Sequence, residues 1–144
     1  MKLTNYTDYS LRVLIFLASK HSDELSNIKE IADTYSISKN HLMKVIYRLG
    51  QLGYVETIRG RGGGIRLGMT PEDINIGEVV RNTEDDFNIV ECFDSKKNLC
   101  IISPACNLKN LLNEALQAYL AVLDKYTLRD LVKNKEEIMR LLRS

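Results

Sequence analysis

The order of apolar and polar residues predicts three helices at the start of the chain. Apolar side chains recur at helical spacing over residues 5–20 and again over 27–35, with oxygen-bearing residues ahead of each run to act as caps. A third helix is expected to begin after Ser38. It places Leu42, Val45, Ile46 and Leu49 at i, i+3, i+4 and i+7, on one buried stripe. A short turn at 36–38 between two helices is typical of a helix-turn-helix.

The segment that follows reads as a glycine-rich hairpin. Short strands are expected at 54–59 and 65–69, joined by the loop 60–64. The loop is not a nucleotide-binding GxGxxG, because Ile65 stands where the last glycine is needed, and no Gly-Lys-Ser/Thr follows it. A hairpin directly after a helix-turn-helix indicates a winged helix-turn-helix.

The second half of the chain predicts helices around 76–82 and 107–126, with an irregular segment between them. Thr127 to Asp130 resembles a capping box that opens a last charged helix. The expected fold class is therefore mainly α with a small β wing. We expect a winged helix-turn-helix domain over 1–80 (wing about 54–69), a cysteine-containing loop region over 81–106, and a dimerisation helix and C-terminal helix over 107–144.

The helix over 107–126 has an apolar stripe close to a heptad seam. Its members are Leu108, Leu111, Leu112, Ala115, Tyr119, Val122 and Tyr126. The stripe could belong to the core of a single subunit. Because helix-turn-helix proteins usually dimerise to bind two half-sites, we favour a symmetric homodimer built on this helix.

Composition narrows the class of protein. The 144 residues are 44 % hydrophobic and 27 % charged, as in soluble globular proteins. No apolar run approaches the ~20 residues of a membrane span, and the first residues lack the pattern of a signal peptide. We expect a cytoplasmic protein with no membrane association, in which thiols stay reduced.

Charge is unevenly distributed, which favours a nucleic-acid partner. Residues 38–66 hold six Lys/Arg and one acid, whereas 84–94 hold five acids and no base. Asn and Lys side chains can bind base edges in the major groove, and arginines of a wing can enter the minor groove. The expected contacts to double-stranded DNA are Ser38, Lys39, Asn40, His41, Lys44, Tyr47, Arg48, Arg59 and Arg61. Solvated surface is the alternative for each of them.

The three cysteines, Cys92, Cys100 and Cys106, lie within fifteen residues. The CxxC spacing of structural zinc sites is absent, while longer loops can wrap an iron–sulfur cluster. Chance clustering of buried thiols is the alternative. A four-iron cluster needs a fourth ligand from another residue type or another subunit. Neither a Ser-His-Asp arrangement nor a paired-carboxylate pocket is suggested, so we expect no enzyme.

Several runs together resemble the family of winged-helix iron–sulfur regulators. They are IKEIADTYSISKNHLMKVIYRLGQLGYVETIRGRGGGIRLG, TPEDINIGEVVR, the cysteine segment and the long helix, which cover nearly the whole chain. The runs TNYTDYSLRVLIFLA and NIVECFDSKKNLCIISPAC are most similar to its nitric-oxide-sensing members. The resemblance implies a homodimeric repressor with one 4Fe–4S cluster per subunit. Such a repressor binds palindromic operators and releases them, derepressing nitrosative-stress genes, once nitric oxide has nitrosylated the cluster.

The resemblance also implies a ligand set. Cys92, Cys100 and Cys106 match the cluster ligands, Asp8 of the partner subunit matches the fourth, and Arg12 then lies near the cluster. The alternative for Asp8 is an acid at a helix N-terminus that pairs with Arg12 at i, i+4.

One departure from the family pattern bears on the signal. Members of the family that sense cluster supply have a histidine three positions beyond the third cysteine, where this chain has Lys109. A same-fold regulator that senses iron or cluster supply is the alternative function. A small iron–sulfur electron carrier would explain the cysteines but not residues 38–66.

Overall fold

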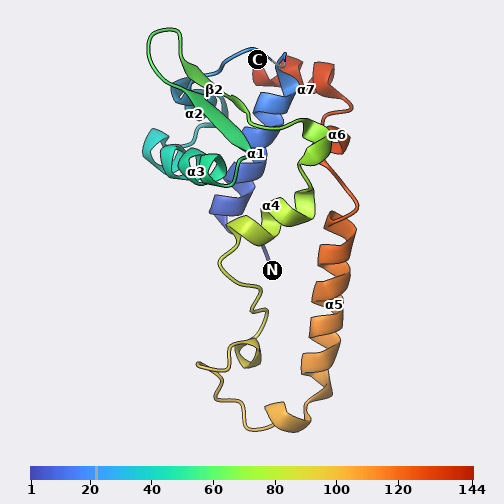
Figure 1. The fold of residues 1–144 in the computed structure, drawn as a ribbon. Coiled ribbons are helices and arrows are strands. Elements are labelled where there is room, and N and C mark those ends of the chain that lie inside the picture. Colours follow the sequence, from blue (N-terminus) through green and yellow to red (C-terminus); the bar gives the residue numbers. More distant parts are fainter. Residues whose placement is uncertain (22) are drawn as a thin grey trace.

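Helix α1 (Asn5–Ser19) is the central element of the computed structural model, which describes residues 1–21 and 23–144. The helix-turn-helix, the wing and the last two helices surround α1, and together they form a head from which α5 projects (Figure 1). The elements of the head are α2 (Ile28–Tyr35), α3 (Lys39–Gln51), β1 (Val55–Ile58), β2 (Gly64–Leu67), α4 (Ile76–Thr83), α6 (Leu128–Leu131) and α7 (Lys135–Leu142).

Side-chain caps fix where the first three helices begin. Thr4, Asn27 and Ser38 each accept a hydrogen bond from a backbone N–H in the first turn of the helix that follows. Ser36 closes the turn between α2 and α3 in the left-handed conformation, with φ 55°. The predicted helix-turn-helix is confirmed, with boundaries within a few residues of those expected.

The wing is a two-stranded antiparallel sheet whose register runs from Val55 opposite Leu67 to Ile58 opposite Gly64. Its tip needs glycine at residue 63 for lack of space, since a Cβ there would lie 2.1 Å from the carbonyl oxygen of Ile58. The predicted mainly helical fold with a small wing is therefore confirmed.

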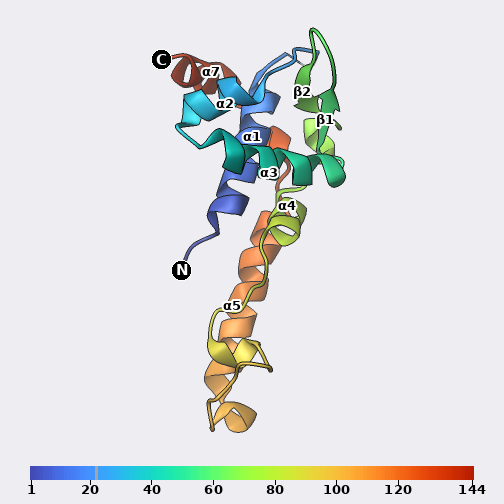
Figure 2. The ribbon, with the colours of Figure 1, turned by 90° about the vertical axis from the view of Figure 1, so that its left-hand side faces the viewer.

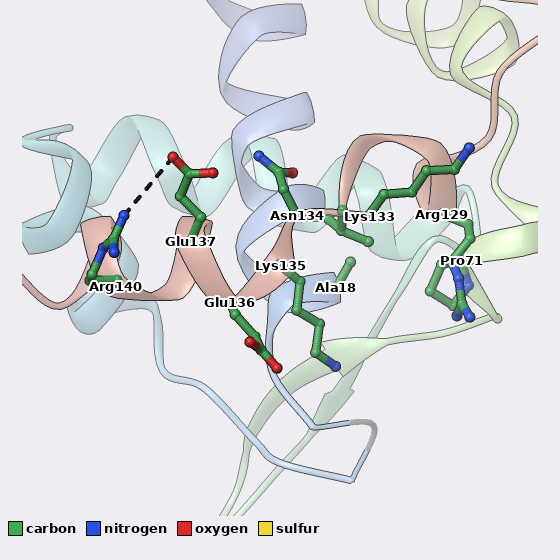
Figure 3. Close-up of a pocket in the computed structure, with 10 residues that line it drawn as sticks. Ala18, Pro71, Arg129, Lys133, Asn134, Lys135, Glu136, Glu137 and Arg140 are labelled. Atoms are coloured by element: carbon green, nitrogen blue, oxygen red, sulfur yellow. Dashed lines mark ion pairs between the residues drawn. The ribbon is translucent and has the colours of Figure 1, made fainter.

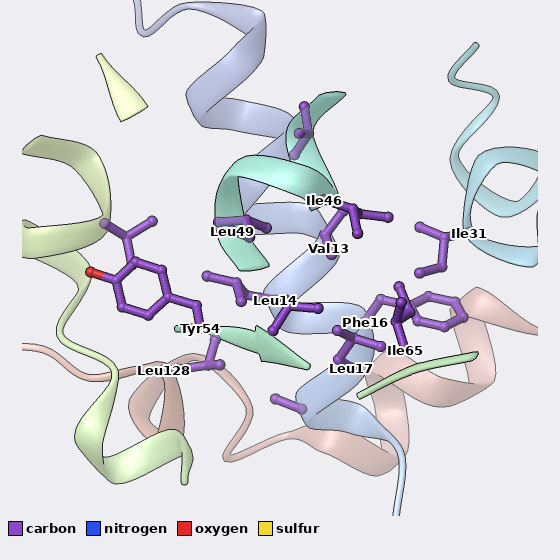
Figure 4. Close-up of a cluster of buried hydrophobic side chains, with 14 of the residues drawn as sticks. Val13, Leu14, Phe16, Leu17, Ile31, Ile46, Leu49, Tyr54, Ile65 and Leu128 are labelled. Atoms are coloured by element: carbon purple, nitrogen blue, oxygen red, sulfur yellow. The ribbon is translucent and has the colours of Figure 1, made fainter. Parts of the chain in front are cut away.

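The core of the head forms where α1 meets α3, the wing and α6 (Figure 4). Leu14 and Leu49 are fully buried there, and Tyr54 closes the core beside α4. A smaller cluster of Val80, Leu116 and Leu120 joins α4 to the C-terminal half of α5. Burial of this apolar surface is the main source of stability for such a small head.

The end of the chain differs from the prediction. In place of one last charged helix, the structure has α6 and α7, separated by residues 132–134, and both pack against α1. Leu128 is fully buried and Val132 is 6 % exposed. The capping box of Thr127 and Asp130 is present. Burial of these apolar side chains on α1 outweighs continuation of a straight helix.

Helix α5 (Asn107–Leu123) and the preceding segment project together from the head in both views (Figures 1 and 2). The segment from Glu84 to Cys106, called here the cysteine loop, contains no regular structure beyond two 3-10 turns, η2 (Glu91–Phe93) and η3 (Ser103–Ala105). Within residues 1–21 and 23–144, no helix combines the length and the apolar content that a bilayer span requires.

Candidate functional site

Helix α3 presents a polar face to solvent. Lys39, Asn40, Lys44 and Tyr47 are exposed, and Tyr47 shows 70 % of its surface. Ser38 is also exposed, and its hydroxyl accepts the backbone N–H of His41 at 3.0 Å. The opposite stripe of α3 is buried in the core, as predicted. Five of the expected DNA contacts therefore lie at the surface of the head, whereas Arg48 is half-buried.

Most basic side chains of α3 and the wing form no ion pair with the residues that the structure describes. Of the six Lys/Arg between residues 38 and 66, only Arg66 is paired in the part of the chain that the structure describes, with Glu56 at 3.1 Å. Arg59 and Arg61 are exposed at the tip of the wing. Lysine and arginine without carboxylate partners are available to neutralise phosphates.

His41 lies in a different environment from the one expected. Its ring is half-buried against Tyr9 of α1, with ring centroids 5.0 Å apart in an edge-to-face arrangement. One turn away, the hydroxyl of Tyr6 donates to the carbonyl of Lys44 at 3.5 Å. Burial raises the pKa of Tyr6, which keeps that hydroxyl a donor. Two tyrosines of α1 thus contact α3, which the sequence pattern did not indicate.

The three cysteines are free thiols on the cysteine loop, each partly exposed. In the described residues, no three His, Cys, Asp or Glu side chains gather closely enough to hold one metal ion. Three thiols on one long irregular loop nevertheless fit an iron–sulfur cluster in donor chemistry. Cys106 is also the N-cap residue of α5, where the helix dipole favours a negatively charged group.

Asp8 and Arg12 form a two-point ion pair on the first turns of α1. The guanidinium donates to both carboxylate oxygens, at 2.8 and 3.1 Å, and both side chains are about two-fifths exposed. Arg12 also lies over the rings of Tyr9 and Tyr35. The i, i+4 pair with Arg12, the alternative to a ligand role for Asp8, is thus formed within one subunit. The carboxylate of Asp8 is still accessible to solvent.

Glu84, the first residue of the cysteine loop, is held by the first turn of α1. Its carboxylate accepts the backbone N–H of Thr4 at 3.0 Å and the hydroxyls of Thr4 and Thr7. Thr7 is fully buried and also accepts from the hydroxyl of Thr83 at 2.9 Å. Nearly eighty residues separate these partners in sequence, so no local pattern could have indicated the network.

Apolar side chains remain uncovered along α5 and on the cysteine loop. Leu108, Leu111, Tyr119, Val122 and Tyr126 are between 37 and 59 % exposed. Leu99 and Ile101, on either side of Cys100, are 85 and 92 % exposed. An apolar surface of this extent on a small protein is typical of an interface.

An open hollow on the head is lined mainly by residues of α6, α7 and the segment between them (Figure 3). Charged side chains line it, among them Arg140 and Glu137, which form an exposed pair at 4.0 Å. The other lining residues include Lys133, Lys135 and Glu136, so charges of both signs face the hollow.

Comparison with known proteins agrees with this arrangement. The model of the Rrf2 family, described as an iron-dependent transcriptional regulator, matches residues 3–134. The chain is 86 % identical over 143 residues to the HTH-type transcriptional regulator NsrR of Bacillus subtilis (strain 168), covering 99 % of this chain and 98 % of that one. It is 74 % identical to the NsrR of Bacillus licheniformis, covering 99 % of both chains.

Solved structures with the same fold include CymR, the global cysteine regulator of B. subtilis, and the IscR of T. potens. The first has a TM-score of 0.75 and 32 % identity, covering 93 % of this chain and 98 % of that chain. The second also has a TM-score of 0.75, with 25 % identity, and the match covers 96 % and 90 %. From the matched family model and these relatives, we conclude that the chain belongs to the Rrf2 family of transcriptional regulators.

Proposed function

We propose that the chain is a homodimeric repressor that binds palindromic operators and releases them in response to nitric oxide. The observation that carries this proposal is the set of three free thiols on one loop, placed between α4 of the head and the uncovered apolar face of α5. The similarity to regulators named NsrR supports nitric oxide as the signal.

In this proposal Cys92, Cys100 and Cys106 hold a 4Fe–4S cluster, with Asp8 of the partner subunit as the fourth ligand. When bound, the cluster supplies iron that reacts with nitric oxide. Each oxygen of Asp8 accepts one hydrogen bond from Arg12 and keeps a second lone pair with which it could bind iron. Arg12 would then remain beside the site as a nearby positive charge.

The face of α3 and the wing would bind the operator. Asn40 and Lys44, both exposed, would bind base edges in the major groove, while Arg59 and Arg61 would bind in the minor groove or to the phosphates. Two heads joined through α5 would bind two half-sites about one turn of DNA apart. The same proposal includes a cytoplasmic location and no catalytic activity.

Anaerobic purification tests the cofactor. The expected result is a coloured protein with about four iron and four sulfide per subunit, the content of one 4Fe–4S cluster. Operator binding measured before and after anaerobic titration with nitric oxide tests the signal. A colourless protein, or DNA binding that does not change with nitric oxide, would reject the respective part of the proposal.

The variant Asp8→Ala tests the fourth ligand, with Asp33→Ala as its matched control. Asp33 forms an i, i+4 pair with Lys29 at 2.8 Å on α2, remote from the cysteine loop. We expect the visible spectrum of the cluster to change only in Asp8→Ala, while far-ultraviolet circular dichroism stays the same in both. An unchanged cluster spectrum in Asp8→Ala would remove Asp8 from the ligand set.

A regulator that senses iron or cluster supply is the second candidate, because the IscR of T. potens shares the fold. Lys109 stands where supply-sensing members have a histidine ligand, which favours the first candidate. The fold itself does not determine the signal, since CymR, the global cysteine regulator of B. subtilis, has it too. Release of the operator by stoichiometric nitric oxide distinguishes the two candidates.

A further inference from the structure

Two connectors of the head pair with each other beside α5. Residues 74–76, which lead from the wing into α4, run antiparallel to residues 126–128, which lead from α5 into α6. The hydrogen bonds are Leu128 N–H to the carbonyl of Ile74 at 2.8 Å and Ile76 N–H to the carbonyl of Tyr126 at 3.0 Å. The end of α5 is therefore attached through backbone bonds to the segment that follows the wing.

Side chains add a second attachment at the same place. Asp124, the C-cap residue of α5, pairs through both oxygens with the guanidinium of Arg81 on α4, one of the two contacts being 2.9 Å. Asn75 donates to the carbonyl of Asp124 at 2.8 Å. Gly77 makes room for the pair, because a Cβ at that position would lie 1.8 Å from a carboxylate oxygen of Asp124.

These contacts form what we call the α4–α5 joint, defined by residues 74–81 and 124–128. Backbone bonds fix where α5 meets the head. The two-point pair of a planar guanidinium with a carboxylate also restricts direction, since both groups must stay nearly coplanar. The pair lies at the edge of the head, with its two side chains about two-fifths exposed, so it adds little apolar burial. Its main effect is on the orientation of α5.

Orientation of α5 matters because α5 carries the uncovered apolar face while α3 belongs to the head. In a dimer joined through α5, the distance and angle between the two α3 helices follow from the angle at each joint. Half-sites lie about 34 Å apart for one turn of DNA, and each added base pair moves a half-site by about 3.4 Å and turns it by about 35°.

The geometry points to Arg81 and Asp124 as the positioning residues that determine which half-site spacing the protein accepts. This inference rests on the proposed homodimer. Neither residue lies on the face of α3 or on the wing, so both act through the joint and not by contact with DNA. With the joint intact, the two heads fit one spacing; with the pair broken, α5 turns more freely and the heads fit several.

The test is a spacing series. A preferred duplex is selected from a random library with the wild-type protein, and its centre is then lengthened or shortened by one or two base pairs. We expect wild-type affinity to fall about tenfold for one added base pair, a loss comparable to that of one mismatched position. In Arg81→Gln and Asp124→Asn, we expect the same added base pair to lower the affinity by about threefold or less.

Further variants separate orientation from stability. Gly77→Ala keeps both charges and favours the helix, yet its methyl group would displace Asp124, so it should broaden the spacing preference in the same way. Arg140→Gln removes an exposed ion pair of α7 outside the joint and should keep the wild-type preference. Circular dichroism and thermal unfolding of each variant establish that the head is folded in the protein that is assayed.

The possible outcomes differ for the two proposals. A wild-type protein that binds a single half-site as tightly as the selected duplex would refute the palindromic dimer itself. A wild-type protein that prefers two half-sites but accepts every spacing would refute the role of the joint. A wild-type preference that Arg81→Gln, Asp124→Asn and Gly77→Ala all retain would refute the role of the joint and leave the dimer intact. Folded variants with a broadened preference, beside an unchanged Arg140→Gln, would support the inference.

Discussion

Replacing Glu84 by glutamine tests the connection between the first turn of α1 and the start of the cysteine loop. One carboxylate oxygen accepts three hydrogen bonds, from the backbone and hydroxyl of Thr4 and from the hydroxyl of Thr7. A hydrogen bond to a charged group contributes about 1.5–3 kcal/mol when it is well buried. Glu84 is partly exposed, so solvent screening reduces the expected loss in the free energy of unfolding to about 1–2 kcal/mol.

A double-mutant cycle with Thr7→Val isolates the contribution of this contact. Valine keeps the shape of the buried side chain and removes its hydroxyl, while Thr83 can still donate to the carbonyl of Val79 at 2.7 Å. We expect Thr7→Val to cost about 1–2 kcal/mol and the two changes to couple by about 0.5–1.5 kcal/mol. Urea denaturation of the apoprotein, at the same protein concentration throughout, measures the free energy of unfolding of the wild type, the two single variants and the double variant.

The control for the cycle is Glu136→Gln, which removes a charge from an exposed position of α7. A coupling energy between Glu84 and Thr7 within about 0.3–0.5 kcal/mol of zero would refute the reasoning, because independent sites add to that accuracy. Hydrogen exchange gives a second measurement. The amide of Thr4 should exchange faster in Glu84→Gln than in the control.

The same carboxylate predicts a dependence on pH. Burial raises the pKa of Glu84, but the hydrogen bonds from Thr4 and Thr7 lower it by more, so its pKa in the folded protein is below the ordinary value. A lowered pKa stabilises the fold above the unfolded value, and that stabilisation is lost as pH falls through the folded value. The stability difference between wild type and Glu84→Gln should be constant near neutral pH and shrink in acid. A difference that grows in acid would contradict this sign.

Three other variants test the DNA-binding face, the core and the apolar face of α5. Arg61→Ala should reduce the slope of log affinity against log salt by about 0.9, measured by fluorescence anisotropy, whereas Arg140→Ala on α7 should leave it unchanged. Leu128→Ala should lower the free energy of unfolding in urea by about 2–5 kcal/mol, because this side chain is fully buried against α1, and a loss below about 1 kcal/mol would contradict that packing. Leu111→Glu should yield monomers in sedimentation analysis, while Leu141→Glu, an equally exposed position on α7, should remain dimeric.

Local patterns in the sequence predicted the helix-turn-helix and the wing well. Ser38 caps α3 through a hydrogen bond to a residue three positions later, and Gly63 at the wing tip lies against backbone only a few residues earlier. Backbone requirements of this kind are visible in a single sequence, because a cap or a tight turn needs particular residue types. The apolar stripe of α3 was equally clear, since every member faces one core.

Contacts between distant segments were not predictable in this way. The break between α6 and α7 has neither proline nor glycine, and it occurs because Leu128 and Val132 bury against α1. His41 has a polar side chain and a polar neighbourhood in sequence, yet Tyr9 covers part of its ring. The pairing of Arg81 with Asp124 likewise depends on how α5 packs beside α4, which the spacing of apolar residues does not indicate.

Helix α5 is held to the head over its C-terminal half, by the α4–α5 joint and by the cluster of Val80, Leu116 and Leu120, and its other end follows the cysteine loop. Its 17 residues span about 25 Å, from Cys106 at the loop to Asp124 in the joint. On that length a displacement of about 2 Å at Cys106 turns the helix by only about 5°, whereas moving a head by one base pair needs about 35°. In the proposed dimer, a loop displacement of this size would tilt the heads and weaken their binding to one operator, but the rotation is too small to fit them to an operator of another spacing.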